Sequence, residues 1–209
     1  MAALEENWIN NSVELIGVLG GCPRFSHVSR DEVYDIFPLD IHRLSGAVDT
    51  INIMARRDLL AQVELTAAPK ITVRGELRSF NNKTGLGSRL IITVFARTIT
   101  LCDADDENQV DLRGVLCKAP THRRTPMGRE ICDLMLAVGR RYGRSDYLPC
   151  IAWGQNAIEA GAWTVGTAVE LNGRIQSRKY VKLENDIATE KTAFEVSIIT
   201  QKRLTDVDA

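Results

Sequence analysis

The sequence predicts an all-β fold made of two small five-stranded barrels in tandem. The chain repeats itself after about 97 residues, and the repeated segments alternate apolar and polar side chains, as half-buried strands do. With 209 residues, of which 44% are hydrophobic and 25% charged, it is long enough for two domains of roughly 100 residues that each bury a core. This composition also excludes a chain that is disordered throughout.

The repeat starts with a predicted strand that carries a glycine at the same place in both copies. Asn11–Leu19 reads NSVELIGVL, and Asn108–Leu116 reads NQVDLRGVL. A short stretch with a cysteine, a proline and a histidine follows each strand. Because further matching segments recur in the same order, we interpret the chain as a duplication. These matches are Glu32–Ile36 with Glu130–Leu134, Asp49–Ala55 with Asp146–Ala152, Ile71–Ser79 with Val169–Ser177, and Leu90–Ala96 with Phe194–Thr200.

One short helix is predicted between the third and fourth strands of each copy, over Asp58–Leu65 and over Gln155–Ala162. Five strands with a helix between the third and the fourth are the layout of the OB-fold, a small and partly open barrel. We therefore expect an N-terminal OB-fold over residues 1–104, a C-terminal OB-fold over residues 105–204 and a short acidic tail over residues 205–209.

Glycine and proline positions add local expectations. Pro38 is expected to interrupt the second strand of the first copy, because proline cannot donate a ladder hydrogen bond. Four glycines fall inside predicted strands, where they suit the sharp bends that close a barrel. They are Gly17, Gly75, Gly114 and Gly173.

The net charge of −1 hides an uneven distribution of charge. Residues 111–182 carry 12 basic and 6 acidic side chains, a net of +6, whereas residues 10–110 carry 11 basic and 13 acidic ones, a net of −2. A local positive field, rather than the total charge, attracts phosphates. The basic segment is compatible with a polyanionic partner, and equally with a solvated basic face balanced by acids folded beside it.

The second copy interleaves aromatic and basic side chains along its predicted strands and turns. Residues two apart share one face of a strand, so Tyr147 and Trp153 lie on one face and the small apolar residues between them on the other. Binding of single-stranded nucleic acid requires rings on which bases stack and a basic track for phosphates. The basic candidates are Arg140, Arg141, Arg144, Arg178 and Lys179.

Packing is the simpler interpretation of aromatic residues in a strand, since their β-propensity alone explains them. The interleaved arginines favour a binding surface for Tyr147 and Trp153 over that interpretation. Trp163, which follows the second predicted helix, is expected to fill the core instead.

The first copy lacks most of these aromatic residues at the equivalent places, and its net charge is negative. We therefore expect it to serve mainly as scaffold or subunit interface. Arg43, Arg56 and Phe80 are weaker candidates that would extend the binding path.

The second copy resembles the bacterial single-stranded DNA-binding protein family over nearly all of residues 108–204. By this resemblance, Tyr142, Tyr147, Trp153 and Tyr180 fall where family members place base-stacking aromatics. The first copy resembles the family only in outline. The matching segments are Val110–Leu116, Arg124–Arg129, Leu136–Arg141, Asp146–Gly154, Val169–Tyr180 and Thr192–Ser197.

The resemblance also implies partners. Family members usually assemble four OB barrels, and a duplicated chain is similar to those that do so as dimers, so a homodimer is expected. Members commonly end in a flexible tail with a terminal phenylalanine that recruits repair and replication enzymes. This sequence ends in the short acidic segment Leu204–Ala209, without an aromatic residue, so recruitment through such a tail is not expected.

No enzyme, metal or membrane motif stands out. The sequence holds no HExxH, GxxxxGK[ST] or GxSxG motif, and its three histidines are widely spaced, so neither catalysis nor a metal or other cofactor is expected. No apolar run approaches the roughly 18 residues of a membrane span, and Met1–Trp8 does not read as a signal peptide. Five cysteines without a CxxC pair indicate reduced thiols in the cytoplasm, with Cys132 and Cys150 close together in the core.

The sequence therefore predicts a non-enzymatic protein that binds and protects single-stranded DNA, with little sequence preference, in replication, recombination or repair. The alternative is an OB-fold accessory module that binds replication proteins, which the acidic balance of the first copy favours. A third interpretation, binding of single-stranded RNA, differs only in the ligand.

Overall fold

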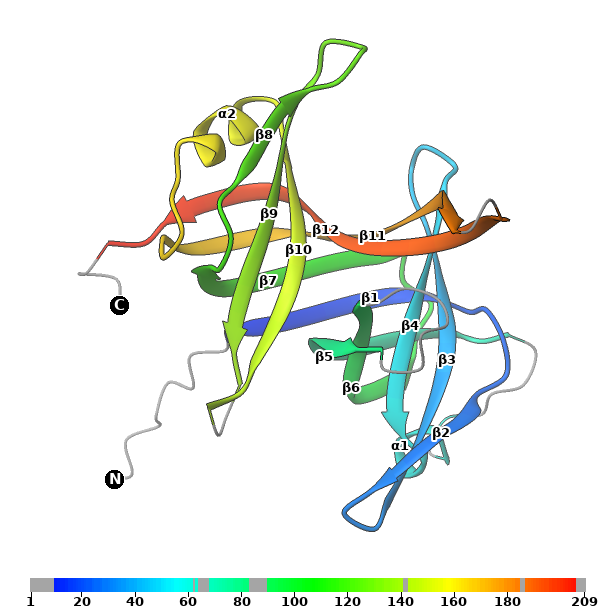
Figure 1. Ribbon diagram of the computed structural model, residues 1–209. Helices are drawn as coiled ribbons and strands as arrows, with labels where there is room; N and C mark the ends of the chain where they lie inside the picture. The colour runs from blue at the N-terminus through cyan, green and yellow to red at the C-terminus, as the bar shows by residue number, and fades with distance from the viewer. Residues whose placement is uncertain are drawn as a thin grey trace.

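The structure is a computed structural model that describes residues 10–61, 63, 68–82, 90–140, 143–184 and 187–205. Within these residues it consists almost entirely of strands with two short helices, arranged as two barrels side by side (Figure 1). The predicted all-β fold of two tandem barrels is confirmed.

The N-terminal barrel has six described strands rather than the five expected. The additional strand, β2, forms a hairpin with β3, and nearly all of its side chains are exposed. A strand without a buried face lacks the apolar alternation that marks a strand in a sequence, so this one was not predicted. The elements are β1 (Asn11–Leu19), β2 (Arg24–Ser29), β3 (Glu32–His42), β4 (Val48–Arg56), α1 (Arg57–Ala61), β5 (Lys70–Asn81) and β6 (Leu90–Leu101).

The C-terminal barrel repeats this order, again with one strand more than expected. All four side chains of its second strand are exposed, as in the first barrel. Its helix ends within one residue of the predicted position, whereas α1 is shorter than predicted over the described residues. The elements are β7 (Glu107–Leu116), β8 (Thr121–Arg124), β9 (Glu130–Gly139), β10 (Ser145–Trp153), α2 (Gln155–Gly161), β11 (Ala168–Glu184) and β12 (Ile187–Arg203).

One continuous sheet joins the two barrels, with the strand order β2-β3-β4-β6-β5-β1-β7-β11-β12-β10-β9-β8. The link is the antiparallel pair β1–β7 at the centre of the molecule (Figure 1), where Val13 lies opposite its own repeat equivalent, Val110. The pairs on either side mirror each other, so a pseudo-twofold axis passes through this position. The mirrored pairs are Asn11 with Leu112 and Leu15 with Asn108.

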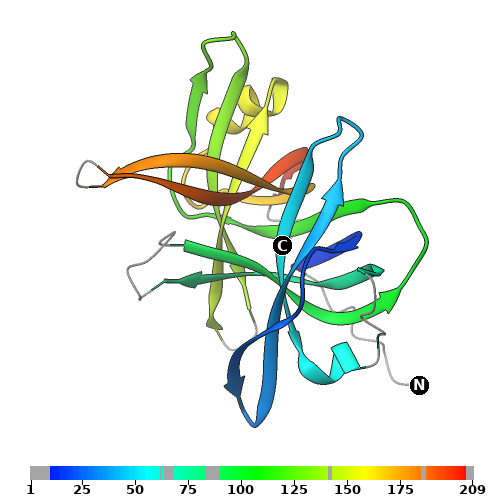
Figure 2. The same ribbon diagram turned by 90° about the vertical axis from the view of Figure 1, so that its right-hand side faces the viewer.

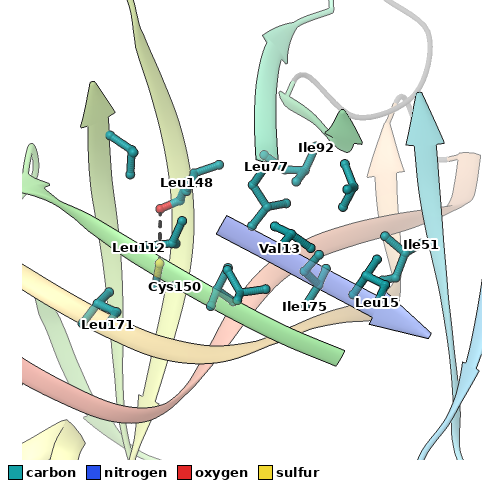
Figure 3. Packing of buried hydrophobic residues seen from close by; sticks show 14 of the residues in the cluster. Val13, Leu15, Ile51, Leu77, Ile92, Leu112, Leu148, Cys150, Leu171 and Ile175 are labelled. Carbon is teal, nitrogen blue, oxygen red and sulfur yellow. Dashed lines mark hydrogen bonds between the residues drawn. The ribbon is translucent and has the colours of Figure 1, made fainter. Parts of the chain in front are cut away.

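The hydrophobic core is continuous across β1 and β7. Figure 3 shows Val13 of β1 beside Leu77, and Leu112 of β7 close to Leu148 and Cys150, so each central strand packs into its own barrel. Apolar residues that lie two apart on a strand supply these contacts, as the sequence alternation predicted.

The expected core positions of Trp163, Cys132 and Cys150 are confirmed. The Trp163 side chain is buried, and so are both cysteines, which lie on the neighbouring strands β9 and β10. Burial raises the pKa of the Cys150 thiol to about 12. Such a thiol stays protonated and therefore behaves as a small apolar core group.

Strand glycines lie where two strands make their closest contacts. A Cβ atom added to Gly75 would lie 2.1 Å from the carbonyl oxygen of Phe95, and one added to Gly173 would lie 2.3 Å from that of Ser197. Both glycines coincide with a register shift between the paired strands. The bend therefore depends on the missing side chain. Gly17 and Gly114 show the same close approach.

Pro38 does not interrupt β3, contrary to the expectation. Its carbonyl oxygen accepts a hydrogen bond from the N–H of Gly20 at 3.0 Å. In an antiparallel ladder, the N–H and C=O groups of one residue face the same neighbour, so the ring nitrogen of Pro38 faces away from β4. On that side β3 changes its partner from β2 to β1, and no hydrogen bond to β4 is lost.

The acidic connection between the barrels is held against the N-terminal one. Asp106 accepts a hydrogen bond from the N–H of His42 at 2.6 Å and pairs with Lys70 at 2.7 Å. Burial acts to raise the pKa of Asp106, but the hydrogen bonds from Lys70 and His42 outweigh it and hold this pKa below its usual value. The connection is thus fixed by a charged contact.

A buried aspartate of the C-terminal barrel braces the junction between the barrels. Asp146, near the start of β10, accepts a hydrogen bond from Arg140 Nε at 2.5 Å and one from the backbone N–H of Ser79 in β5 at 2.6 Å. Arg78 donates a third at 3.0 Å. The Asp146 side chain has no exposed surface, so the charges of Arg140 and Arg78 compensate its carboxylate.

The same device recurs with the roles of the two barrels exchanged. Asp49 of β4, also buried, binds the Nε and Nη2 atoms of Arg43 at 2.5 Å and accepts the N–H of Ser177 in β11 at 3.1 Å. Asp49 and Asp146 are equivalent positions of the repeat, as are Arg43 and Arg140. In each barrel the aspartate of one arginine–aspartate pair therefore accepts a backbone N–H from the other barrel.

Replacement of Gly173 by alanine should lower the free energy of unfolding by about 1–3 kcal/mol, because the new methyl group would overlap the Ser197 carbonyl and force the strands apart. Chemical denaturation monitored by circular dichroism measures this. Gly139→Ala is the matched control: an added Cβ there meets nothing within 4 Å, so its effect should stay within about 0.5 kcal/mol. Equal effects of the two variants would contradict the close approach.

Asp146→Asn should destabilise the protein by about 3 kcal/mol at neutral pH, since it leaves Arg140 and Arg78 without their buried carboxylate. Burial acts to raise the pKa of Asp146, yet the hydrogen bonds from Arg140, the N–H of Ser79 and Arg78 hold it below its usual value. The carboxylate therefore stabilises the fold above about pH 4, and this contribution is lost as the pH falls through the lowered folded-state pKa.

The measurement is denaturant unfolding of both proteins across the acidic pH range, where the difference between them should shrink as the pH falls. Asp133→Asn is the control. Asp133 pairs with Arg123 at the surface, and such pairs contribute about 0–1 kcal/mol. A difference between the Asp146 variant and the unmodified protein that is independent of pH would refute the assignment.

Candidate nucleic-acid interface

The outer face of β10 presents two aromatic side chains to solvent. Tyr147 is 50% exposed and Trp153 is 38% exposed, while Leu148 and Ala152 between them are buried. The predicted alternation is present, with one exception. Ile151 belongs to the outer set but is buried, because β10 pairs there with β12. The two rings lie on one strand about 20 Å apart, at 3.3 Å per residue.

A hydrogen bond fixes the orientation of Trp153. Its indole Nε1–H donates to Ser197 Oγ of β12 at 3.2 Å. The polar edge of the indole is therefore satisfied within the protein, while more than a third of the residue stays exposed. A ring held in this way is ordered before a ligand arrives, which lowers the entropic cost of binding.

Tyr147 lies where the two barrels meet. Its backbone N–H donates to Ser79 Oγ of β5 at 2.8 Å. The next residue of β5, Phe80, is 39% exposed, and the guanidinium carbon of Arg140 lies 5.6 Å from the centre of its ring. The structure thus brings Phe80 of the N-terminal barrel to the junction that carries Tyr147.

The predicted arginines fall into two groups. Arg140 and Arg43 form the buried pairs with Asp146 and Asp49 described above, and burial against the carboxylate leaves both guanidinium groups largely covered. The hydrogen bonds that Arg43 donates to Asp49 raise the pKa of Arg43. Each arginine thus holds the aspartate that accepts a backbone N–H from the other barrel, and Arg140 also donates to the Ser79 carbonyl there. Arg144, in contrast, is exposed and forms no ion pair with the described residues.

Arg56 is half exposed but already paired. Its guanidinium group binds Asp58 at 2.5 Å and lies 3.5 Å from Glu32. The charge of Arg56 is therefore largely compensated within the N-terminal barrel.

Several predicted residues cannot be placed in the site. Arg141 and Tyr142 lie outside the described residues. Arg178, Lys179 and Tyr180 belong to β11, which pairs with β12 over its whole length, but their side chains are not among those described. Figure 2 shows the paired strands β11 and β12 as a long ribbon that projects from the barrel.

The sequence prediction missed a group of aromatic contacts on the N-terminal barrel. The rings of His27 and Tyr34 stack at a centroid distance of 5.0 Å, and Tyr34 also contacts Phe95 at 5.6 Å. Arg97 covers the Phe95 ring at 5.0 Å. Phe95 lies between the buried apolar residues Val94 and Ala96, and this alternation could have shown that it faces outward. Tyr34 has no such signal, because its neighbours are the partly buried Val33 and the acidic Asp35.

The described residues contain no group of three or more histidine, cysteine, aspartate or glutamate side chains that could hold a metal ion. Nor does any helix among them have the length and apolar character needed to cross a membrane. All five cysteines are free.

Comparison with known proteins agrees with this architecture. Residues 107–204 match the model of the single-strand binding protein family. The chain is 34% identical over 104 residues to single-stranded DNA-binding protein B of Bacillus subtilis (strain 168), an alignment that covers 46% of this chain and 92% of that protein.

Solved structures extend the similarity of fold to both barrels. The wild-type single-stranded DNA-binding protein from Thermus aquaticus superposes with a TM-score of 0.75 and 22% identity, covering 93% of each chain. A deletion mutant of the same protein gives a TM-score of 0.74 over 94% of this chain and 95% of that one. The fold is thus that of two OB barrels, and the chain belongs to the single-strand binding protein family.

Proposed function

We propose that this protein binds and protects single-stranded DNA, with little sequence preference, in replication, recombination or repair. The observation that carries the proposal is the exposed outer face of β10, where Tyr147 and an oriented Trp153 stand in a barrel segment with a net charge of +6 (12 basic and 6 acidic residues over 111–182). Rings accept bases of any sequence by stacking, and the basic surroundings attract the phosphates.

The binding path runs from Trp153 along β10 to Tyr147 and then across the junction to Phe80. Arg144 is the exposed basic residue closest in sequence to this strand and serves as a phosphate contact. Arg140 acts as a positioning residue, since it holds Asp146 and lies over the Phe80 ring. Arg141, Arg178 and Lys179 remain proposed contacts because the sequence interleaves them with aromatic residues, and Tyr142 and Tyr180 because of the family resemblance.

The function is binding rather than catalysis, it needs no cofactor, and the DNA is encountered in the cytoplasm. A protein-binding accessory role remains the second candidate, because the arginines of the N-terminal barrel are largely paired with acidic side chains. The two candidates differ in one respect that can be measured: only the first requires affinity for nucleic acid in the absence of other proteins.

Tyr147→Ala and Trp153→Ala should each weaken binding of an oligo(dT) of about 35 nucleotides by roughly fivefold to a hundredfold, since one stacked base contributes about 1–3 kcal/mol. Fluorescence anisotropy of a labelled oligonucleotide measures this. Log affinity of the unmodified protein should fall with log salt concentration, by about 0.7 per phosphate contacted. Competition with poly(U) compares RNA with DNA.

Ile158→Ala is the matched control, because this apolar residue of α2 is as exposed as Tyr147 and lies off the β10 face. Its affinity should equal that of the unmodified protein. Failure of the unmodified protein to bind the oligonucleotide at micromolar concentration and low salt would refute the proposal and favour the accessory role.

We also propose a homodimer with four barrels, as the family resemblance implies. Light scattering of the protein alone should then give a mass near twice the 23.2 kDa of one chain. A mass of one chain at all concentrations tested would refute the dimer and leave the binding proposal intact.

A further inference from the structure

We infer that the N-terminal barrel carries a second set of base-stacking side chains, and that a bound single strand continues onto it from the C-terminal barrel. The inference rests on the proposed function and replaces the expectation that the first barrel is mainly scaffold. It concerns His27 of β2, Tyr34 of β3, and Phe95 and Arg97 of β6, called here the N-terminal aromatic row.

Each member of the N-terminal aromatic row contacts the next one in space. His27 and Tyr34 are stacked within 9° of parallel at 5.0 Å, Tyr34 meets Phe95 at 5.6 Å and 40°, and the Arg97 guanidinium lies 5.0 Å from the centre of the Phe95 ring. Flat groups from three strands thus form one unbroken series. Such a series offers stacking surface at its open end, where His27 is exposed.

The row lies on the surface of the barrel and is not part of its core. Strands β3 and β6 are both neighbours of β4, so their backbones lie about 10 Å apart. Ring centres separated by 5.6 Å must therefore lean toward each other over β4. The β4 residue opposite Phe95, Met54, is only 9% exposed, whereas Tyr34 and Phe95 keep part of their surface in solvent.

The row occupies the same face as Trp153 does in the other barrel. Equivalent strand pairings place Arg56 where the C-terminal barrel has Trp153, and Phe95 where it has Ser197. Strands β4 and β10 are equivalent, and so are β6 and β12. The exposed ring therefore lies on β10 in the C-terminal barrel, but on β6, the neighbour of β4, in the N-terminal barrel. An alignment of the two copies finds Arg56 where the second copy has Trp153, and so indicates that the aromatic ring is missing. The structure shows that Phe95, on the neighbouring strand, supplies a ring on the same face.

The row also continues the proposed binding path. Glu76, Arg78 and Phe80 lie two residues apart on β5 and share one face, and Glu76 lies directly opposite Phe95 in the ladder. Phe80 at the junction and the N-terminal aromatic row are thus about 13 Å apart along one face of the same pair of strands. A single strand of DNA that passes Tyr147 and Phe80 therefore reaches the N-terminal aromatic row on the same face of the sheet.

Paired charges distinguish the row from the C-terminal site. Arg97 is bound to Glu76 at 3.0 Å and Arg56 to Asp58 at 2.5 Å, so little positive charge remains for phosphates. The repeat equivalent of Glu76 is Arg174, a reversal of charge at the same place. The row therefore binds bases by stacking, with a weaker dependence on salt than the C-terminal site.

The test compares a short oligo(dT) of about 10 nucleotides, near the site size of one OB-fold, with a long one of about 35 nucleotides. The double variant His27→Ala, Phe95→Leu removes two rings and keeps an apolar side chain at position 95. We expect it to bind the long oligonucleotide at least fivefold more weakly, with an unchanged salt slope and an unchanged affinity for the short one. Trp153→Ala should weaken both.

Val28→Ala is the control, since Val28 is an exposed aliphatic residue of β2 next to His27. Thermal unfolding followed by circular dichroism establishes that each variant is folded, and His27→Ala alone, at an exposed position, provides a second variant. Ultraviolet crosslinking of a strand containing 5-bromouracil should recover peptides with Tyr34 or Phe95.

Affinity for the long oligonucleotide within twofold of the unmodified protein, for folded variants, would overturn the inference. So would crosslinks confined to the C-terminal barrel, or a loss of binding to a protein partner with DNA affinity unchanged. These outcomes are distinct from failure of the proposed function, in which the unmodified protein binds neither oligonucleotide.

Discussion

The antiparallel pairing of β1 with β7 is the constraint on which the rest of the molecule depends. It places Val13 against its repeat equivalent Val110, merges two barrels into one sheet and sets their relative orientation. The crossed contacts of Asp49 with Ser177 and of Asp146 with Ser79 follow from that orientation. Removal of either aspartate would leave a partly buried arginine uncompensated, so the junction resists separation of the barrels.

Conservation of the framework contrasts with divergence of the surface. Buried residues, strand glycines and the arginine–aspartate pairs occupy equivalent places in the two barrels, because packing and barrel closure impose the same demands on both. Outward-facing positions are free of those demands. There the two barrels differ, with Trp153 where the other has Arg56 and Ser197 where the other has Phe95.

Predictions from the sequence were correct where the local pattern of apolar and polar residues determines which side of a strand is buried. Alternation on β10 predicted that Tyr147 and Trp153 face outward and that Cys150 faces the core, and the repeat predicted two barrels. The sequence pattern failed for β2 and β8, whose exposed side chains show no alternation. It did not reveal that Arg140 also contacts the Ser79 carbonyl of the other barrel, because that contact depends on how two distant segments meet, which no local pattern records.

The fusion of both barrels in one chain has a consequence for the orientation of a ligand. Two identical barrels related by an exact twofold axis present the same groups to a bound DNA strand in either of its two orientations. Here the axis is only approximate, since one end of the surface carries Trp153 and the other carries Tyr34 and Phe95. A directional polymer that spans both barrels therefore has two inequivalent binding modes, and the 5′-to-3′ polarity of the bound strand becomes a property that the protein can select.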